Sequence, residues 1–268
     1  MARGPAVVTG ASSGLGWAYA QSLAARGHPL IVVARREERL RELAVWARTH
    51  HGVDTRIVVA DLATSDGLAL CREEIARSAE VPEIVVLNAG FGSQGPLWTL
   101  DRAREADMVR LNCVAVTDLA ACVLPAMVAR GSGALIVVSS AAAWQPVPFM
   151  ATYAATKAFD LHFTEAVAEE LRGTGVRALA VCPGPTRTEF SLSGGGQASH
   201  PTIPFDDVDT VVRATWKALE AGRSRVPTGI VARLSLIGGR ILPRRVVVRM
   251  AALTHRRSSA LKGSDPRT

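Results

Sequence analysis

Three side chains have the types and spacing that proton transfer needs. Tyr153 and Lys157 are four residues apart, and Ser140 lies thirteen residues before Tyr153. Residues i and i+4 share one face of a helix, so the phenol and the ammonium group can converge. The chain has only two tyrosines and three lysines, which makes a chance pairing rare. We therefore predict a catalytic pair rather than a core tyrosine beside a surface lysine.

The chemistry of this pair favours a carbonyl or an alcohol as substrate. A free tyrosine has a pKa of about 10 and exchanges protons poorly at neutral pH, but a nearby ammonium group lowers that pKa. Tyr153 is then able to protonate a carbonyl oxygen on reduction, or to deprotonate a hydroxyl on oxidation. Ser140, at the predicted end of a strand, is placed to hydrogen-bond the same oxygen. A bound cofactor would supply or accept the hydride.

A glycine-rich turn near the start of the chain predicts the site of that cofactor. Gly10, Gly14 and Gly16 follow an apolar run and precede a helical pattern. In a strand–turn–helix unit such glycines allow a tight turn, a close approach to a pyrophosphate, and packing of the helix on the sheet. The helix N-terminus then faces the phosphate. The alternative is a tight turn with no ligand.

The residues after the second apolar run indicate which dinucleotide binds. A site for NAD(H) usually has an acid there, which holds the ribose 2′-hydroxyl. Here Ala34 is followed by Arg35 and Arg36, whose guanidinium groups suit a 2′-phosphate, and Ser13 adds a hydroxyl. We therefore expect NADP(H) rather than NAD(H). The alternative is that the two arginines only begin a solvated helix.

The elements that position these residues alternate along the chain. Six apolar runs predict buried parallel strands, and six segments with helical patterns predict helices. The strands are expected at Ala6–Thr9, Leu30–Ala34, Thr55–Val59, Ile84–Asn88, Gly133–Ser139 and Val176–Pro183, and the helices at 15–26, 36–50, 66–79, 101–129, 152–172 and 206–221. This alternation predicts a single α/β domain, a Rossmann-type doubly wound parallel sheet of about seven strands with helices on both faces.

Taken together, these motifs resemble the short-chain dehydrogenase/reductase family over about residues 3–230. The matching motifs are the cofactor turn TGASSGLG (9–16), Asp61-Leu62, Asn88-Ala89-Gly90, Asn112, Ser140, YAATK (153–157) and the PGxxxT segment 183–188. The resemblance implies an oxidoreductase that interconverts a ketone or aldehyde and an alcohol. One departure is Leu87, which stands where the family has the first Asn of NNAG.

The resemblance also assigns roles to individual residues. It implies a catalytic set of Asn112, Ser140, Tyr153 and Lys157, in which Asn112 holds a water that links the lysine to solvent. Together with the arginines above, it implies cofactor contacts from Gly10, Ser12, Ser13, Gly14, Leu15, Gly16, Arg35, Arg36, Asp61, Leu62, Asn88, Ala89, Gly90, Tyr153, Lys157, Pro183, Gly184, Thr186 and Thr188. For the substrate pocket we expect Ser140, Trp144, Phe149, Met150, Tyr153 and Phe190, with 189–204 as a loop over it. Core packing or a dimer contact is the alternative for these aromatic residues.

Composition excludes several other classes of protein. The four cysteines form no CxxC pair and the six histidines are scattered, so we expect reduced thiols and no metal site. We see no signal peptide pattern, and the uncharged stretch 131–156 is broken by Gly, Pro and polar residues, so we expect a cytoplasmic protein. Nucleic-acid binding is not expected, because no surface motif interleaves aromatic and basic residues.

The net charge of +7 belongs to the end of the chain. Residues 240–268 carry eight Lys or Arg and one acid, whereas residues 1–239 carry 23 of each sign. We expect 1–239 to be the catalytic domain and 240–268 to be a basic tail, either part of the same domain or frayed. Pro243 is placed to open a helix with Val246, Val247, Met250 and Leu253 on one side.

Several alternatives stay open from the sequence. The tail helix either packs on the body or a partner subunit, which we favour, or lies on an anionic membrane. We expect a homodimer or homotetramer built through helices 101–129 and 152–172, as in the family. The rival functions are a biosynthetic ketoreductase of narrow specificity and a cofactor-binding sensor or scaffold without turnover. The sequence names neither the substrate and its stereochemistry nor the physiological direction.

Overall fold

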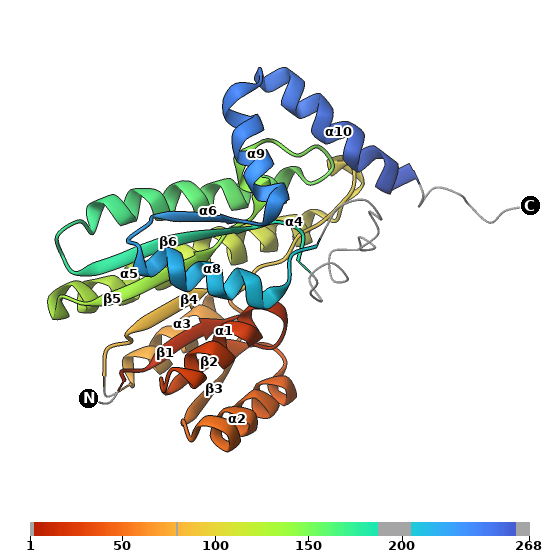
Figure 1. Ribbon diagram of the computed structural model, residues 1–268. Coiled ribbons are helices and arrows are strands. Elements are labelled where there is room, and N and C mark those ends of the chain that lie inside the picture. Colours follow the sequence, from red (N-terminus) through yellow and green to blue (C-terminus); the bar gives the residue numbers. More distant parts are fainter. Residues whose placement is uncertain (1–2, 79, 187–204, 261–268) are drawn as a thin grey trace, which may run out of the picture.

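The centre of the molecule is a parallel sheet of seven strands. The computed structural model describes residues 3–78, 80–186 and 205–260. The strands are β1 (Ala6–Thr9), β2 (Leu30–Ala34), β3 (Thr55–Val59), β4 (Ile84–Leu87), β5 (Gly133–Val138), β6 (Val176–Pro183) and β7 (Arg225–Thr228). Their order is β3-β2-β1-β4-β5-β6-β7, and every neighbouring pair is parallel (Figure 1). The predicted doubly wound fold is confirmed.

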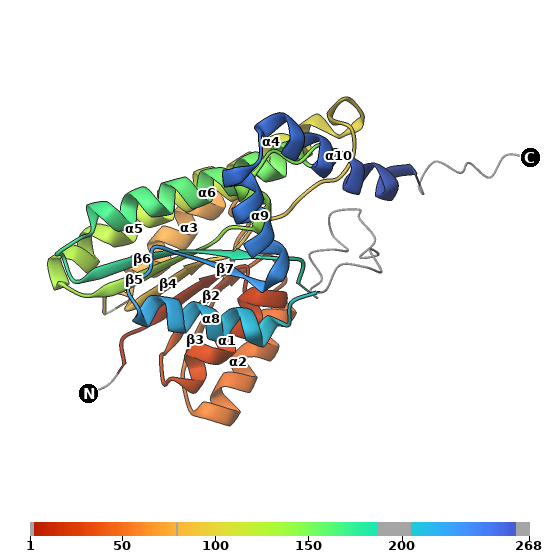
Figure 2. The ribbon, with the colours of Figure 1, turned by 45° about the horizontal axis from the view of Figure 1, so that its top comes forward.

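Helices cover both faces of this sheet (Figures 1 and 2). On one face lie α1 (Gly14–Ala25), α2 (Glu37–His51) and α8 (Val208–Glu220). On the other lie α3 (Ser65–Ala76), α5 (Ala115–Arg130) and α6 (Ala151–Glu170). Because side chains alternate along a strand, Val8 of β1 packs with the first set and Val7 with the second.

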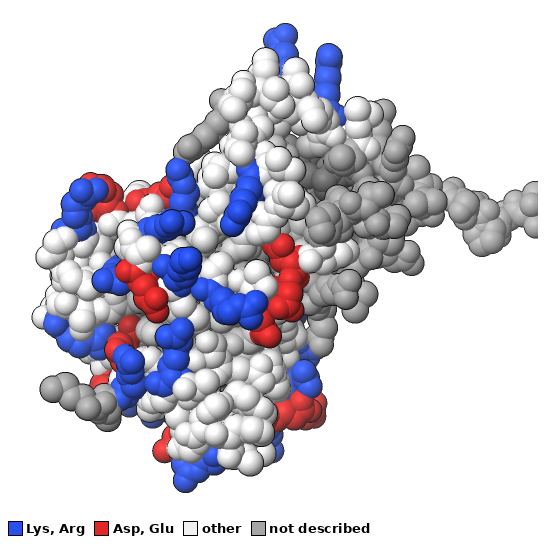
Figure 3. Space-filling model, in the orientation of Figure 1, with Lys and Arg blue, Asp and Glu red and all other residues white. Residues whose placement is uncertain are grey.

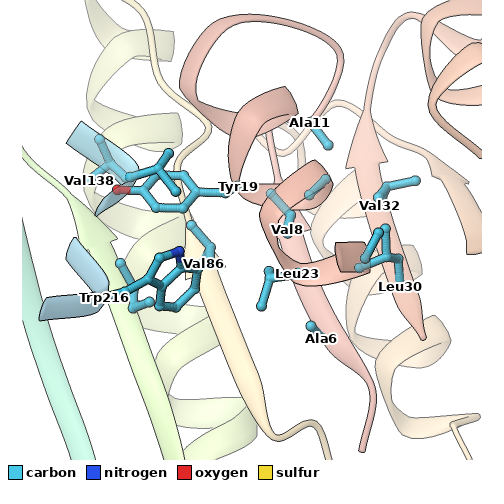
Figure 4. Packing of buried hydrophobic residues seen from close by; sticks show 14 of the residues in the cluster. Ala6, Val8, Ala11, Tyr19, Leu23, Leu30, Val32, Val86, Val138 and Trp216 are labelled. Carbon is cyan, nitrogen blue, oxygen red and sulfur yellow. The ribbon is translucent and has the colours of Figure 1, made fainter. Parts of the chain in front are cut away.

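The core under α1 and α8 is built around aromatic side chains. Tyr19 and Trp216 meet edge to face with ring centroids 6.1 Å apart (Figure 4). The Tyr19 hydroxyl lies 2.7 Å from Thr215 Oγ1, and the Trp216 indole N–H donates to Ser22 Oγ at 2.8 Å. Both polar groups are therefore paired, which is the condition for burying these residues without a large desolvation cost.

The long helix predicted for 101–129 is interrupted. It consists of α4 (Arg102–Val109), a π-helical turn η2 (Arg110–Val114) and α5. By length and hydropathy the stretch Arg102–Arg130 is long and apolar enough to cross a membrane. Leu119, Val123 and Met127, however, are buried against the sheet, as in the core helix of a globular domain.

The C-terminal part contains three further elements. The sequence patterns did not locate the first two, β7 and α9 (Gly229–Ile241), and predicted only the start of the third, α10 (Arg244–Ala260). Strand β7 contains Pro227, which is tolerated because β7 is an edge strand. Helices α9 and α10 follow it. Pro243 immediately precedes α10, as predicted. Helix α9 packs against η3 (Ala141–Trp144), and α10 contacts α9 and lies near the segment that contains the short η1 (Leu97–Thr99) (Figures 1 and 2).

Candidate active site

The predicted proton-transfer residues meet where β5 ends and α6 begins. Ser140 follows β5 and caps η3, its Oγ accepting the Ala142 N–H at 3.1 Å. Tyr153 and Lys157 lie one turn apart on the buried face of α6. The preceding Ser139 donates its hydroxyl to the Lys157 carbonyl at 2.7 Å, which joins β5 to α6. The strand end and the helix thus hold the serine, tyrosine and lysine in one place.

Lys157 is buried and held by two hydrogen bonds. Its Nζ donates to the Val138 carbonyl at 2.8 Å and to Asp160 Oδ2 at 2.9 Å. Burial alone lowers the pKa of Lys157, but Asp160 and Tyr153 outweigh that effect, so the pKa lies above its ordinary value. The ammonium form is therefore favoured, which is the form that stabilises a phenolate at Tyr153.

Asp160 is a member of this site that the sequence reasoning missed. Its carboxylate is fully buried, and Oδ1 has no hydrogen-bond partner. Burial raises its pKa to about 6, and the ion pair with Lys157 only partly opposes that effect. A signal was present in the sequence, since Asp160 lies three residues after Lys157 and so on the same helix face.

Asn112 lies at the π-helical turn and is completely buried. Its amide donates to Thr156 Oγ1 at 2.9 Å, and Thr156 in turn donates to the Tyr153 carbonyl at 2.8 Å. A Cβ added at Gly90 would lie 3.0 Å from Asn112 Oδ1 and 3.5 Å from Lys157 Nζ. Asn112 is therefore part of the same cluster as the lysine, as the family resemblance implies.

The glycine-rich turn has the geometry that a pyrophosphate site requires. Gly10 and Gly14 have positive φ angles of 67° and 55°. A Cβ at Gly16 would lie 2.2 Å from the Gly10 carbonyl oxygen, so only glycine allows this contact between turn and helix. Ser13 precedes α1 without a side-chain cap, and the first turn of α1 has no acid. The free end of the helix therefore suits an anion.

The rest of the predicted adenosine side surrounds that turn. Ser12 and Leu62 are buried, Leu15 is half-buried and packs on the core, and Asp61 accepts the Ala63 N–H at 3.0 Å. Asn88 joins β4 to the turn, since its side-chain amide donates to the Thr9 carbonyl at 3.0 Å. Ala89 N–H donates to Thr9 Oγ1 at 3.0 Å. Leu87, the departure from the family pattern, is buried in the core instead of making a polar contact.

Two of the three arginines at the end of β2 converge on Ser12. Arg36 donates through Nε and Nη2 to Ser12 Oγ at 3.3 and 3.2 Å, and Arg39 donates to the Ser12 carbonyl at 3.4 Å. Arg35 lies 3.6 Å from Asp61. Arg39, which stacks on Trp17 at 4.7 Å, was not predicted, although it lies one helical turn after Arg36. Three guanidinium groups therefore line this edge of the cofactor turn, of which Arg35 also pairs with Asp61 and Arg39 with Glu42; we call it the cationic edge.

The segment after β6 closes the far side of the site. Pro183 is buried, Gly184 N–H donates to the Thr228 carbonyl at 3.2 Å, and Thr186 Oγ1 donates to the Gly184 carbonyl at 3.0 Å. Thr186 also forms an isolated parallel bridge with Asp206. Thr188, Phe190 and the whole of the predicted loop 189–204 lie outside the described residues.

The residues predicted to line the substrate pocket differ in how they pack. Trp144 packs against the buried Leu161 and Cys182, and Arg225 lies 5.7 Å from its ring, so much of this side chain belongs to the core. Phe149 and Met150 are half-buried and directly precede α6. Phe149 has a positive φ of 69°, which is strained for a bulky residue. Such strain often lies at functional sites.

The described residues contain no cluster of three or more His, Cys, Asp or Glu that would hold a metal ion. Their four cysteines are free, with Cys71 and Cys182 buried and Cys122 exposed. Burial raises the pKa of Cys113, which neighbours the Lys157–Asp160 pair, to about 11, so this thiol stays protonated. The site is thus built from a turn for phosphates, a cationic edge, and a buried tyrosine–lysine cluster.

These features define a class of protein: an oxidoreductase with a nicotinamide cofactor on a Rossmann-type sheet, acting on CH–OH groups. A sequence model described as short chain dehydrogenase matches residues 5–194. The chain is 32% identical over 216 residues to a very-long-chain 3-oxoacyl-CoA reductase of Anas platyrhynchos, covering 78% of this chain and 66% of that protein. It is 36% identical over 204 residues to sulfoacetaldehyde reductase 2 of Chromohalobacter salexigens, covering 75% and 80%.

A solved structure is similar over almost the whole chain. The short-chain dehydrogenase from Sphingobium yanoikuyae in complex with NADPH superposes with a TM-score of 0.78 at 30% identity, covering 98% of both chains. The chain belongs to the short-chain dehydrogenase family. The resemblance that the motifs indicated is therefore confirmed.

Proposed function

We propose that the protein is an NADP(H)-dependent oxidoreductase that interconverts a ketone or aldehyde and an alcohol, with Tyr153 as the general acid and base. The observation that carries this proposal is the pairing of a buried Tyr153 with a buried Lys157 ammonium group beside Ser140. The relatives named above are reductases of carbonyl compounds, which supports the same direction. In the cytoplasm, where we expect the protein, reduction is the favoured direction.

The residues of the turn fit the cofactor. Gly10, Gly14 and Gly16 leave room for phosphates at the N-terminus of α1, and Asp61 and Asn88 border the adenosine side. When bound, the nicotinamide supplies or accepts the hydride. NADP(H) rather than NAD(H) is favoured by Arg35, Arg36 and the additional Arg39, since guanidinium groups bind phosphates through paired hydrogen bonds.

The remaining work falls to side chains of this chain. Ser140 orients the carbonyl oxygen, and the Tyr153 phenol delivers a proton to it. Lys157 holds the phenolate that remains, and Asp160 and the Val138 carbonyl fix the lysine in place. Hydrogen bonds from Asn112 to Thr156 and from Thr156 to the Tyr153 carbonyl hold the backbone at Tyr153. Asn112 also accepts the Phe91 N–H, so it connects α6 to the segment that follows β4.

The test is NADPH consumption with a panel of ketones and aldehydes, comparing the wild type with Tyr153→Phe. We expect kcat to fall by about 10²- to 10⁴-fold in the variant, because proton transfer to the carbonyl oxygen is lost. The affinity for NADPH, measured by fluorescence titration, should change little. Turnover that survives the substitution would reject Tyr153 as the acid. NADPH binding without turnover on any substrate would favour the sensor or scaffold.

We also propose that residues 1–239 are the catalytic domain, with 240–268 as its basic extension, and that the protein is a homodimer or homotetramer. Exposed apolar side chains on the helices expected to form the interface support an oligomer: Val109 of α4, Val114 of η2, Val128 of α5 and Phe159 of α6. Sedimentation velocity tests this: a monomer at micromolar concentration contradicts it.

A further inference from the structure

The two C-terminal helices expose a run of large apolar side chains that no other element matches among the described residues. We call this run the C-terminal apolar stripe; it comprises Ile230, Leu234, Ile237 and Ile241 of α9 and Val246, Met250 and Leu253 of α10. Leu242, which joins the helices, is exposed as well. Soluble proteins commonly expose single apolar residues, but a contiguous set usually marks a binding surface.

On α9 the stripe lies opposite the face that packs on the domain. Its members are spaced by four, three and four residues, which places them on one side of the helix. The other side contains Ala232, which is buried, and Gly239, where an added Cβ would lie 2.8 Å from the Trp144 carbonyl oxygen. Helix α9 therefore packs on the domain through its other side, and the stripe residues of α9 stay exposed.

On α10 the same division holds. Val247 and Ala251 are buried, whereas Val246 and Leu253 are exposed on a different side. The four residues expected on one side of this helix therefore differ in exposure: Val247 is buried, whereas Val246, Met250 and Leu253 are exposed. Helix α10 contacts α9 and still leaves an apolar side outward.

Arginines flank the stripe on both helices. The exposed Arg233 precedes Leu234, Arg245 precedes Val246 and Arg249 precedes Met250. The sequence from Gly229 to Ala260 contains seven arginines and no acid. Figure 3 shows that positive and negative side chains mix over the body, whereas blue side chains without red neighbours stand at the α9–α10 end. Asp206 lies beside Gly229 at the start of α9 and interacts with Arg233, but the charged residues of the two helices themselves are all arginines.

An exposed tryptophan lies at the same end of the molecule. Trp98 of η1 is 86% exposed, and Leu97 beside it is also exposed. In both ribbon views the yellow segment that contains η1 lies beside α10 (Figures 1 and 2). Tryptophan is enriched where proteins meet the polar boundary of a membrane, because its ring is apolar and its N–H is polar.

We propose that the C-terminal apolar stripe, with its flanking arginines and Trp98, docks the protein on the surface of an anionic lipid bilayer. Apolar side chains enter the boundary between headgroups and acyl chains, and arginines pair with anionic headgroups. A second copy is a poorer occupant, because a two-fold contact would bring the arginine rows of both copies together. Nucleic acid matches the arginines but leaves the apolar stripe exposed to water. The inference is independent of the proposed activity.

The experiment is co-sedimentation of the full-length protein with vesicles. We expect binding to vesicles of phosphatidylglycerol and phosphatidylcholine, and much weaker binding to phosphatidylcholine alone. Leu234→Asn combined with Leu253→Asn should weaken binding by about tenfold or more, through loss of apolar burial. Arg245→Gln combined with Arg249→Gln should weaken it by about 25-fold at low salt, since each arginine near such a surface contributes about fivefold.

Matched controls separate the stripe from general charge and hydrophobicity. Val45→Asn, on the exposed side of α2, and the pair Arg213→Gln with Arg223→Gln should leave binding unchanged. The urea midpoint of each variant reports whether it folds, and the arginine variants remain informative if an asparagine variant does not. No binding by the wild type, or equal binding by stripe variants and controls, overturns the proposal. Stripe variants that dissociate an oligomer, or wild-type retention on duplex DNA in place of vesicles, overturn it too.

Discussion

The catalytic cluster and the cationic edge of the cofactor turn are built in opposite ways. At the cluster, Lys157 and Asp160 are buried and paired at 2.9 Å. At the edge, Arg35 and Arg36 are exposed, and Arg35 lies 3.6 Å from the half-exposed Asp61. Burial makes each charge of the cluster depend on its partner, whereas solvent screens the charges of the edge. The chemistry is thus coupled to the stability of the fold, and the cofactor preference is not.

The largest effect should come from removing the charge of Lys157. Lys157→Met leaves the buried Asp160 without its partner, so we expect the free energy of unfolding at pH 7 to fall by about 3–5 kcal/mol. Urea denaturation followed by circular dichroism measures this. Lys157→Met combined with Asp160→Leu should recover most of that loss, because no charge stays buried. A double variant as unstable as the single one would contradict the coupling.

The same pair predicts a pH dependence of stability. Because burial raises the pKa of Asp160 from 3.8 to about 6, the folded state holds this proton more tightly than the unfolded state. The resulting stability is present below about pH 4 and is lost as the pH rises through about 6. Relative to Asp160→Asn, the wild type should therefore lose about 2–3 kcal/mol across that range.

Urea midpoints at intervals between pH 4 and 7 measure this difference. Asp54→Asn is the matched control for removing an acid, because Asp54 is an exposed carboxylate in a surface ion pair with Arg48. Parallel curves for wild type and Asp160→Asn would show that Asp160 does not titrate in this range.

Substitutions at the cationic edge should change the preference between NADPH and NADH rather than the stability of the fold. Ala34→Asp combined with Arg35→Ala places an acid at the end of β2 and removes a guanidinium group. We expect the ratio of kcat/KM for NADPH over NADH to fall by about 10- to 100-fold, the effect of one to two charge-assisted hydrogen bonds. Steady-state kinetics with both cofactors measures the ratio. An unchanged ratio would remove the assignment of these residues to the 2′-phosphate.

The smallest effect on stability should come from removing a positive charge at the cationic edge. Arg35→Ala removes one positive charge, as Lys157→Met does, but from an exposed pair. We expect the free energy of unfolding to change by about 1 kcal/mol or less, since surface ion pairs contribute little. Urea denaturation at pH 7 tests this beside the lysine variant. A loss comparable to that of Lys157→Met would show that the edge is part of the folded framework after all.

The sequence predicted the sheet well because parallel strands buried on both faces are continuous apolar runs. Four of the six predicted strands agree with the observed bounds at both ends, and the other two, Ile84–Asn88 and Gly133–Ser139, were predicted one residue too long. Strand β7 was not located because Arg225 and Pro227 break the apolar pattern. The π-helical turn at Asn112 was also missed, since no residue pattern marks the change of helix type. The residues Asp160 and Arg39 were missed because an acid or arginine within a helix usually faces solvent.

The position of β1 has a consequence for biogenesis on the ribosome. Strand β1 is made first but lies in the middle of the sheet, between β2 and β4. Its partner on one edge, β4, ends at Leu87, so that edge stays unpaired until the chain has grown past it. At about 5–20 residues per second this takes roughly 4–16 s. During that interval the apolar β1, whose Val7 and Val8 end fully buried, is open to pairing with other nascent chains. Chaperone demand should therefore be concentrated in the interval between synthesis of β1 and synthesis of β4.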